Sequence, residues 1–190
     1  MAATNPDDDP GWELSPRTLL VFVPGFVHFA LRSRRSPAAQ DGLTGIRKVW
    51  LCIPVAILAL GVVGLLTGGA STQPVGVSIA FLAVVSVVCL LAAEVFGRRP
   101  LDCSDLAAVA ASNRSRFFLR TAFSEAIALF AFVATMIVGQ WWIYWLFVPF
   151  TLLGFGRNAP TTARVRAEQE RLRLTGCELS LVRALRSPPT

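Results

Sequence analysis

The sequence predicts an all-α integral membrane protein with four transmembrane helices in two hairpins. Hydrophobic residues make up 54% of the 190 residues and charged residues only 16%, whereas soluble domains carry about 25% charged residues. The apolar residues are collected in runs long enough to cross a bilayer, and the arginines lie mainly in the connections between those runs. These observations together argue against a soluble globular domain.

Four apolar runs have a length suited to a membrane. A helix rises about 1.5 Å per residue, so about 20 residues cross a hydrocarbon core of about 30 Å. The predicted spans cover residues 49–67, 75–96, 117–138 and 140–155, which form a four-helix transmembrane domain over 49–156. The last two runs would make a single helix of about 57 Å if they were joined. We therefore expect a break at Gly139 and Gln140.

Charge in the connections predicts the orientation. The segment before the first span, the connection between the second and third, and the tail after the fourth are rich in arginine, whereas the connections 68–74 and 139–140 carry no charge. The positive-inside rule then places both termini in the cytoplasm. Of the 18 cations 17 are arginine, and alanine and valine are abundant, a composition that matches a GC-rich bacterial genome of the actinobacterial type. We therefore expect a multi-pass protein of the bacterial plasma (inner) membrane.

Aromatic side chains open the fourth span, namely Trp141, Trp142, Tyr144 and Trp145. With the termini inside, these residues fall at the outer membrane interface. Tryptophan and tyrosine are enriched there because their rings are apolar at one end and polar at the other. The sequence thus predicts an aromatic belt at the outer end of this span.

The segments outside the spans are predicted as follows. Residues 1–15 form a disordered acidic leader, 16–32 an interfacial or re-entrant helix, 33–48 a basic linker, and 157–190 a basic cytoplasmic helical tail. The apolar stretch 18–31 is only fourteen residues long, which favours the membrane surface over a crossing. A five-span alternative remains open, because acidic residues before this stretch and arginines after it also satisfy the charge rule. Anionic lipid head groups are expected to contact Arg32, Arg34 and Arg35.

Two carboxylates fall inside the predicted spans, Glu94 in the second and Glu125 in the third. A charged carboxylate at the centre of a membrane helix costs about 2.5 kcal/mol or more. In an antiparallel hairpin both residues share the inner leaflet, so they are a possible proton or substrate site. They could face each other and share a proton, or they could pair with Arg98, Arg99 or Arg120 and stabilise the bundle.

The sequence around Glu125 resembles a known helix. From Ser124 to Val133 an acid is followed by a run of small and aliphatic residues that ends in an aromatic residue and a valine. This run resembles the carboxylate-bearing helix of the proteolipid (c) subunits of rotary ATPases. The likeness covers about ten residues, and we do not assign proton translocation to Glu125 on that basis. The chain departs from that family in having four spans in place of two, an off-centre acid, and no glycine repeat in the preceding helix.

Other residue patterns indicate packing and not chemistry. Gly61, Gly64 and Gly68 are spaced to permit close helix contacts. The four cysteines are scattered, so neither a disulfide nor a metal site is expected. The sequence contains one histidine and no recognised enzyme motif. We therefore predict no catalytic activity, no cofactor and no metal, and no nucleic-acid partner despite the basic charge.

The function predicted from these features is that of an accessory or scaffolding subunit in a larger bacterial membrane complex. The expected partners are membrane lipids, including anionic head groups, and other membrane protein subunits. The alternative is a small oligomeric transporter or proton-conducting protein that uses Glu94 and Glu125.

Overall fold

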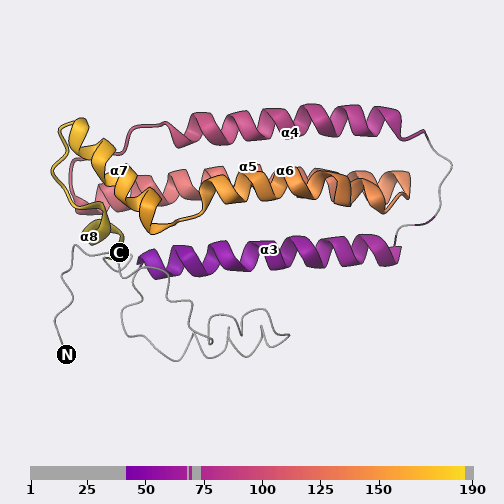
Figure 1. Ribbon diagram of the computed structural model, residues 1–190, viewed down its shortest axis with the longest axis horizontal. Helices are drawn as coiled ribbons and strands as arrows, with labels where there is room; N and C mark the ends of the chain where they lie inside the picture. The colour runs from indigo at the N-terminus through magenta and orange to yellow at the C-terminus, as the bar shows by residue number, and fades with distance from the viewer. Residues whose placement is uncertain (1–41, 68, 70–73, 187–190) are drawn as a thin grey trace, which may run out of the picture. The chain divides into compact units, whose positions relative to one another are not determined.

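The computed structural model describes residues 42–67, 69 and 74–186, and every regular element in these ranges is a helix (Figure 1). This confirms the all-α class. The helices are α3 (Gly42–Thr67), α4 (Gly76–Gly97), α5 (Leu106–Val138), α6 (Trp142–Asn158), α7 (Thr162–Leu174) and α8 (Leu181–Arg186). The predicted leader (1–15), the interfacial helix (16–32) with Arg32, Arg34 and Arg35, and Gly68 lie outside the described residues.

Three helices are long and apolar enough to cross a membrane, namely Gly45–Thr67 within α3, Gly76–Gly97 of α4 and Leu106–Val138 of α5. The shortest of them has 22 residues, which corresponds to about 33 Å. These helices indicate a membrane protein. The predicted spans 49–67, 75–96 and 117–138 fall within them.

The fourth predicted span corresponds to α6, which has 17 residues and a length of about 25 Å. It begins at Trp142 and ends at Asn158. Gly139 has a positive φ of 74°, which glycine adopts without steric cost, and it separates α5 from α6 at the expected break. That α6 crosses the membrane stays a prediction.

Two helices begin earlier than the predicted spans. Helix α3 starts at Gly42, so the last part of the predicted basic linker is helical. Helix α5 starts at Leu106 and runs without interruption for 33 residues. The carboxylate of Asp105 accepts a hydrogen bond from the Ala108 N–H at 2.7 Å, which satisfies one of the free donors at the helix start.

The chain divides into two compact units. The bundle unit comprises 53–100 and 114–159, and the tail unit comprises the chain up to residue 52, 101–113 and the chain from residue 160. Helices α3 and α5 each contribute to both units.

Helices α5 and α6 form the centre of the bundle unit. The Tyr144 hydroxyl of α6 donates to the Ile57 carbonyl of α3 at 2.6 Å, and α6 also packs on α4. In α5, Phe130 makes an edge-to-face contact with Phe81 of α4, with centroids 6.4 Å apart, and Met136 accepts a hydrogen bond from Thr67 of α3 at 3.4 Å. Each central helix therefore contacts both outer helices.

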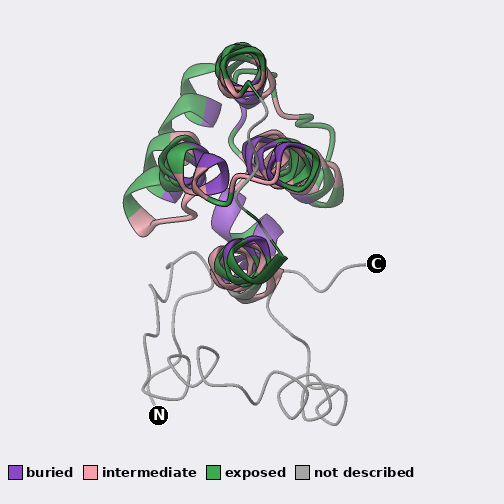
Figure 2. Cartoon of the chain, turned by 90° about the vertical axis from the view of Figure 1, so that its right-hand side faces the viewer, coloured by how far each residue is buried: buried purple, intermediate pink, exposed green. Residues whose placement is uncertain are grey.

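Small and hydroxyl-bearing residues form the buried side of α5. They recur every three or four positions, as Ser124, Ala128, Ala131 and Thr135, and all are fully buried. The outward side of α4 is instead apolar and exposed, as at Val77, which is 80% exposed. Figure 2 shows this division along the helices, with buried residues in purple and exposed residues in green. Small residues inside and apolar residues outside are the arrangement expected where lipid surrounds the helices.

The tail unit has buried residues of its own from α7 and α8, including Val165, Leu172, Leu181 and Leu185. The side chain of Gln169 connects the two helices. Its amide nitrogen donates to the Leu179 carbonyl at 3.1 Å, and its amide oxygen accepts from the Leu181 N–H at 2.5 Å. One glutamine thus satisfies backbone groups on both sides of the turn into α8.

Candidate functional site

Glu94 lies near the end of α4 with its side chain exposed. Its Oε1 atom is 3.2 Å from the Nε of Arg98, one helical turn further on, and the two side chains are 47% and 76% exposed respectively. Glutamate followed four residues later by a cation is the favourable order in a helix. An exposed pair of this kind contributes less than about 1 kcal/mol. Glu94 therefore has an ordinary partner within its own helix.

Glu125 has a different environment. It lies in the third membrane-length helix, α5, and is half-buried. Across the described ranges, its carboxylate takes part in no hydrogen bond or ion pair. Neither of these interactions joins it to Glu94, so the shared-proton arrangement is not formed between the two carboxylates. Of the two carboxylates, Glu125 is thus the one that lacks a partner among the described residues.

Two buried hydroxyls on α5 also lack partners within the described part of the chain, those of Thr121 and Thr135. Thr121 precedes Glu125 by four residues, so both lie on the same side of the helix. Most buried polar groups in folded proteins have a hydrogen-bond partner. Helix α5 therefore carries two unsatisfied buried hydroxyls in addition to a carboxylate without a partner among the described residues.

A small polar contact joins α5 to α6 and was not predicted from the sequence. The Ser124 hydroxyl donates to the Arg120 carbonyl at 2.9 Å, and the Asn158 amide donates to the Ser124 oxygen at 3.4 Å. Gly154 of α6 lies directly against Ser124. In the sequence, Ser124 stands beside Glu125, and Asn158 follows Arg157 at the end of the last apolar run, so neither residue gave a signal of this contact.

The predicted packing glycines differ in their surroundings. A Cβ atom on Gly61 would come within 2.6 Å of the Trp145 ring and 2.9 Å of the Tyr144 ring, whereas one on Gly64 would make an ordinary contact with Thr135 at 3.6 Å. Gly61 therefore lies directly against aromatic rings of α6, whereas Gly64 lies beside α5 with room to spare.

The same contact encloses one member of the predicted aromatic belt, whose depth in the membrane stays a prediction. Tyr144 is fully buried, and its hydroxyl donates to the Ile57 carbonyl. The hydrogen bond to α3 satisfies this hydroxyl inside the bundle unit, so an interfacial position is not needed. Trp141, in contrast, is 45% exposed.

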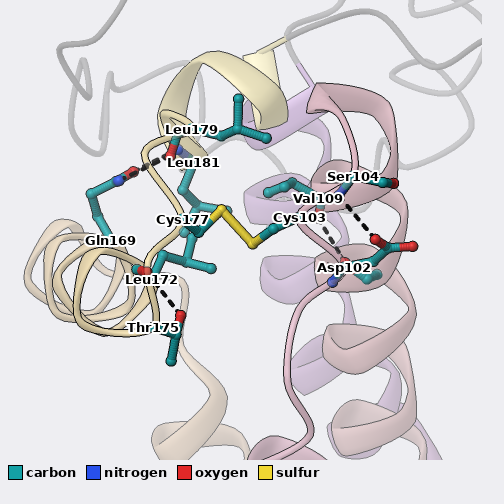
Figure 3. The surroundings of a disulfide bond; sticks show 11 residues. Asp102, Cys103, Ser104, Val109, Gln169, Leu172, Thr175, Cys177, Leu179 and Leu181 are labelled. Atoms are coloured by element: carbon teal, nitrogen blue, oxygen red, sulfur yellow. Dashed lines mark hydrogen bonds between the residues drawn. A yellow bond between two sulfur atoms is a disulfide. The ribbon is translucent and has the colours of Figure 1, made fainter.

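Cys103 and Cys177 form a disulfide within the tail unit, with their Cα atoms 6.1 Å apart (Figure 3). The expectation that no disulfide forms is therefore wrong. The two cysteines are 74 residues apart in the sequence, so their spacing gave no indication of a pair. Cys52 and Cys89 are free.

Local structure positions both sulfur atoms. Helix α7 ends in a Schellman turn, in which Gly176 has a φ of 84° and the Cys177 N–H donates to the Leu172 carbonyl at 3.0 Å. On the other side, the Asp102 N–H donates to the Ser112 hydroxyl at 3.2 Å and its carboxylate accepts from the Ser104 N–H at 3.0 Å. The loop that carries Cys103 is thereby attached to the first turns of α5.

The described residues contain no group of three or more histidine, cysteine, aspartate or glutamate side chains that could hold a metal ion. Comparison with protein-family models, with curated proteins and with solved structures gives no match for this chain. The resemblance of Ser124–Val133 to rotary ATPase c subunits therefore stays a prediction.

Proposed function

We propose that the chain is an accessory or scaffolding subunit of a larger bacterial membrane complex. Glu125 is the observation that carries this proposal, because a half-buried carboxylate in an apolar helix lacks a partner in the described chain. Intramembrane carboxylates normally pair with another polar or charged group. A cationic or hydrogen-bonding residue of a second subunit would supply that partner.

The tail unit supports the same role. Its helices α7 and α8 contribute buried residues such as Leu172 and Leu181, and α7 exposes arginines, such as Arg166 and Arg173. A folded unit with its own buried residues offers a defined surface to a partner. In this proposal α6 is the fourth span, and the apolar outer sides of α3 and α4 contact lipid.

The alternative is a small oligomeric transporter or proton-conducting protein. The unsatisfied hydroxyls of Thr121 and Thr135 on α5 favour it, because a proton or substrate path needs polar groups along a helix. In this case Glu125 is the proton-binding group. Glu94 would have a minor role because Arg98 already pairs with it.

Glu125→Gln separates the two functions, with Glu94→Gln as the matched control. We expect the first variant to lose partners that co-purify with the wild-type chain in mild detergent, because removal of one member of a buried charge pair costs about 3–5 kcal/mol. The control should retain them. We expect proton flux in proteoliposomes to equal that of protein-free liposomes for all three chains. Flux that Glu125→Gln abolishes while assembly stays intact would instead establish the conducting function.

We also propose that both termini and the tail unit are cytoplasmic, in the bacterial plasma membrane, because arginines follow α4 and α6 and are absent from the connections on the other side. The disulfide argues against this orientation, since cytoplasmic thiols are kept reduced. We give more weight to the arginines, because they are numerous and every connection that contains them lies on the same side of the predicted spans. The cysteine pair is then a dithiol in a growing cell.

Cysteine labelling decides the orientation. Gly69, in the connection between α3 and α4, has open space around its Cα, and Arg166 is exposed on α7. We expect a membrane-impermeant maleimide to label Gly69→Cys in intact cells and to label Arg166→Cys only after permeabilisation. The opposite pattern would invert the protein and place the disulfide in an oxidising compartment.

A further inference from the structure

Three arginines gather at the C-terminal end of α4, and we call them the arginine cluster: Arg99, Arg116 and Arg120. The first follows α4, and the other two come from α5. All belong to the bundle unit. Their arrangement is fixed by specific contacts and is more than a general excess of basic residues.

The first contact holds Arg99. Its Cζ atom lies 4.3 Å from the centroid of the Phe96 ring, a cation–π distance. That ring stacks on Phe123 of α5, with centroids 5.2 Å apart and an angle of 15° between the planes. The Nη1 atom of Arg116 donates to the Arg99 carbonyl at 3.0 Å. Aromatic rings from α4 and α5 therefore support the Arg99 guanidinium. A hydrogen bond holds the Arg116 guanidinium at the Arg99 backbone.

The Arg120 side chain occupies space that Gly97 leaves open because glycine has no side chain. A Cβ atom on Gly97 would lie 2.8 Å from its Nε and 2.9 Å from its Cζ. The guanidinium thus rests directly on the backbone of the last residue of α4. A larger residue at position 97 would force it to move.

Arg99 has no counterion on α4. Glu94 is the nearest carboxylate along that helix, and it pairs with Arg98. In the part of the chain that is described, Arg99 has a ring contact and no ion pair.

We propose that the arginine cluster binds the phosphate group of an anionic phospholipid. The guanidinium fork matches phosphate oxygens and can donate two parallel hydrogen bonds. Basic sites between membrane helices are known to bind anionic head groups. The site lies where the apolar helix α4 ends, and the preceding side chains Leu91 and Val95 are 61% and 64% exposed. These apolar side chains offer a surface to the acyl chains of the same lipid.

Native mass spectrometry of the purified full-length chain tests the proposal. The probes are phosphatidylglycerol, phosphatidylcholine with the same acyl chains, and inorganic phosphate. We expect preferential retention of phosphatidylglycerol. Replacement of Arg99 or Arg116 by glutamine should weaken this binding about fivefold for each arginine. The control, Arg173→Gln, removes an exposed arginine of α7 in the tail unit and should leave retention unchanged.

Gly97→Ala provides a second variant that keeps every charge. Its added methyl group displaces Arg120, so we expect weaker retention of phosphatidylglycerol at unchanged net charge. Equal retention of both lipids by the wild-type chain, or an equal loss in Arg173→Gln, would overturn the proposal. If inorganic phosphate displaces phosphatidylglycerol at equal concentration, the arginine cluster binds soluble phosphate and not a lipid, which would also overturn the proposal.

Discussion

Replacement of both Cys103 and Cys177 by serine is expected to lower the free energy of unfolding by about 2–5 kcal/mol. The bond closes a loop across a sequence separation of 74 residues, and such a long loop strongly restricts the unfolded chain. The double variant avoids a lone thiol that could form bonds between molecules. Thermal unfolding of the oxidised protein in detergent measures the effect.

Two controls accompany the disulfide variant. Cys52→Ser changes a free, half-buried cysteine and should have a much smaller effect. A phosphine reductant should lower the unfolding temperature of the wild-type chain to that of the double variant, and it should not affect the double variant itself. A wild-type chain that melts at the same temperature with and without the reductant would contradict the prediction.

Gly154→Ala is expected to lower the free energy of unfolding by about 1–3 kcal/mol. The added Cβ would lie 2.5 Å from the Ser124 Oγ and 2.8 Å from its Cβ. A Cβ atom is fixed to its backbone, so rotation of the serine side chain cannot relieve the clash and α5 and α6 must separate. The change should also break the hydrogen bond between Ser124 and Asn158.

Gly156→Ala is the matched control, because it lies two residues away on the same helix and a Cβ there meets nothing within 4 Å. Alanine favours a helix over glycine by up to about 1 kcal/mol, so this variant should be neutral or more stable. Titration of both variants with denaturing detergent compares them. Equal stability of the two variants would show that α5 and α6 do not depend on close approach at Gly154.

The sequence predicted the three longest apolar helices because their signal is local. A run of consecutive apolar residues such as 75–96 needs no knowledge of tertiary contacts, and α4 spans Gly76–Gly97. The fourth span stays a prediction, since α6 is shorter. Helix α3 begins before its predicted span because hydropathy marks the segment suited to lipid and not the whole helix.

The side of each helix that faces protein could not be predicted in the same way. In water, a helix shows its buried side by a contrast between apolar and polar residues. In this chain both sides of α5 are largely apolar, and the buried side is distinguished by small and hydroxyl-bearing residues such as Ser124 and Ala128. The contacts of Glu94 and Glu125 therefore required the structure. Pairing with Arg98 was one of the predicted alternatives for Glu94, whereas the unpartnered state of Glu125 was not foreseen.

The disulfide has a consequence for biosynthesis. The chain is made from its N-terminus, and Cys177 follows both α5 and α6. The bond cannot form until the ribosome has passed the last apolar helix, so a molecule that carries it has been translated through α7. A single protease cut between the two cysteines would leave both fragments attached on a non-reducing gel. In the oxidised form the two ends of the segment from α5 to α7 thus stay joined even after its peptide chain is cut.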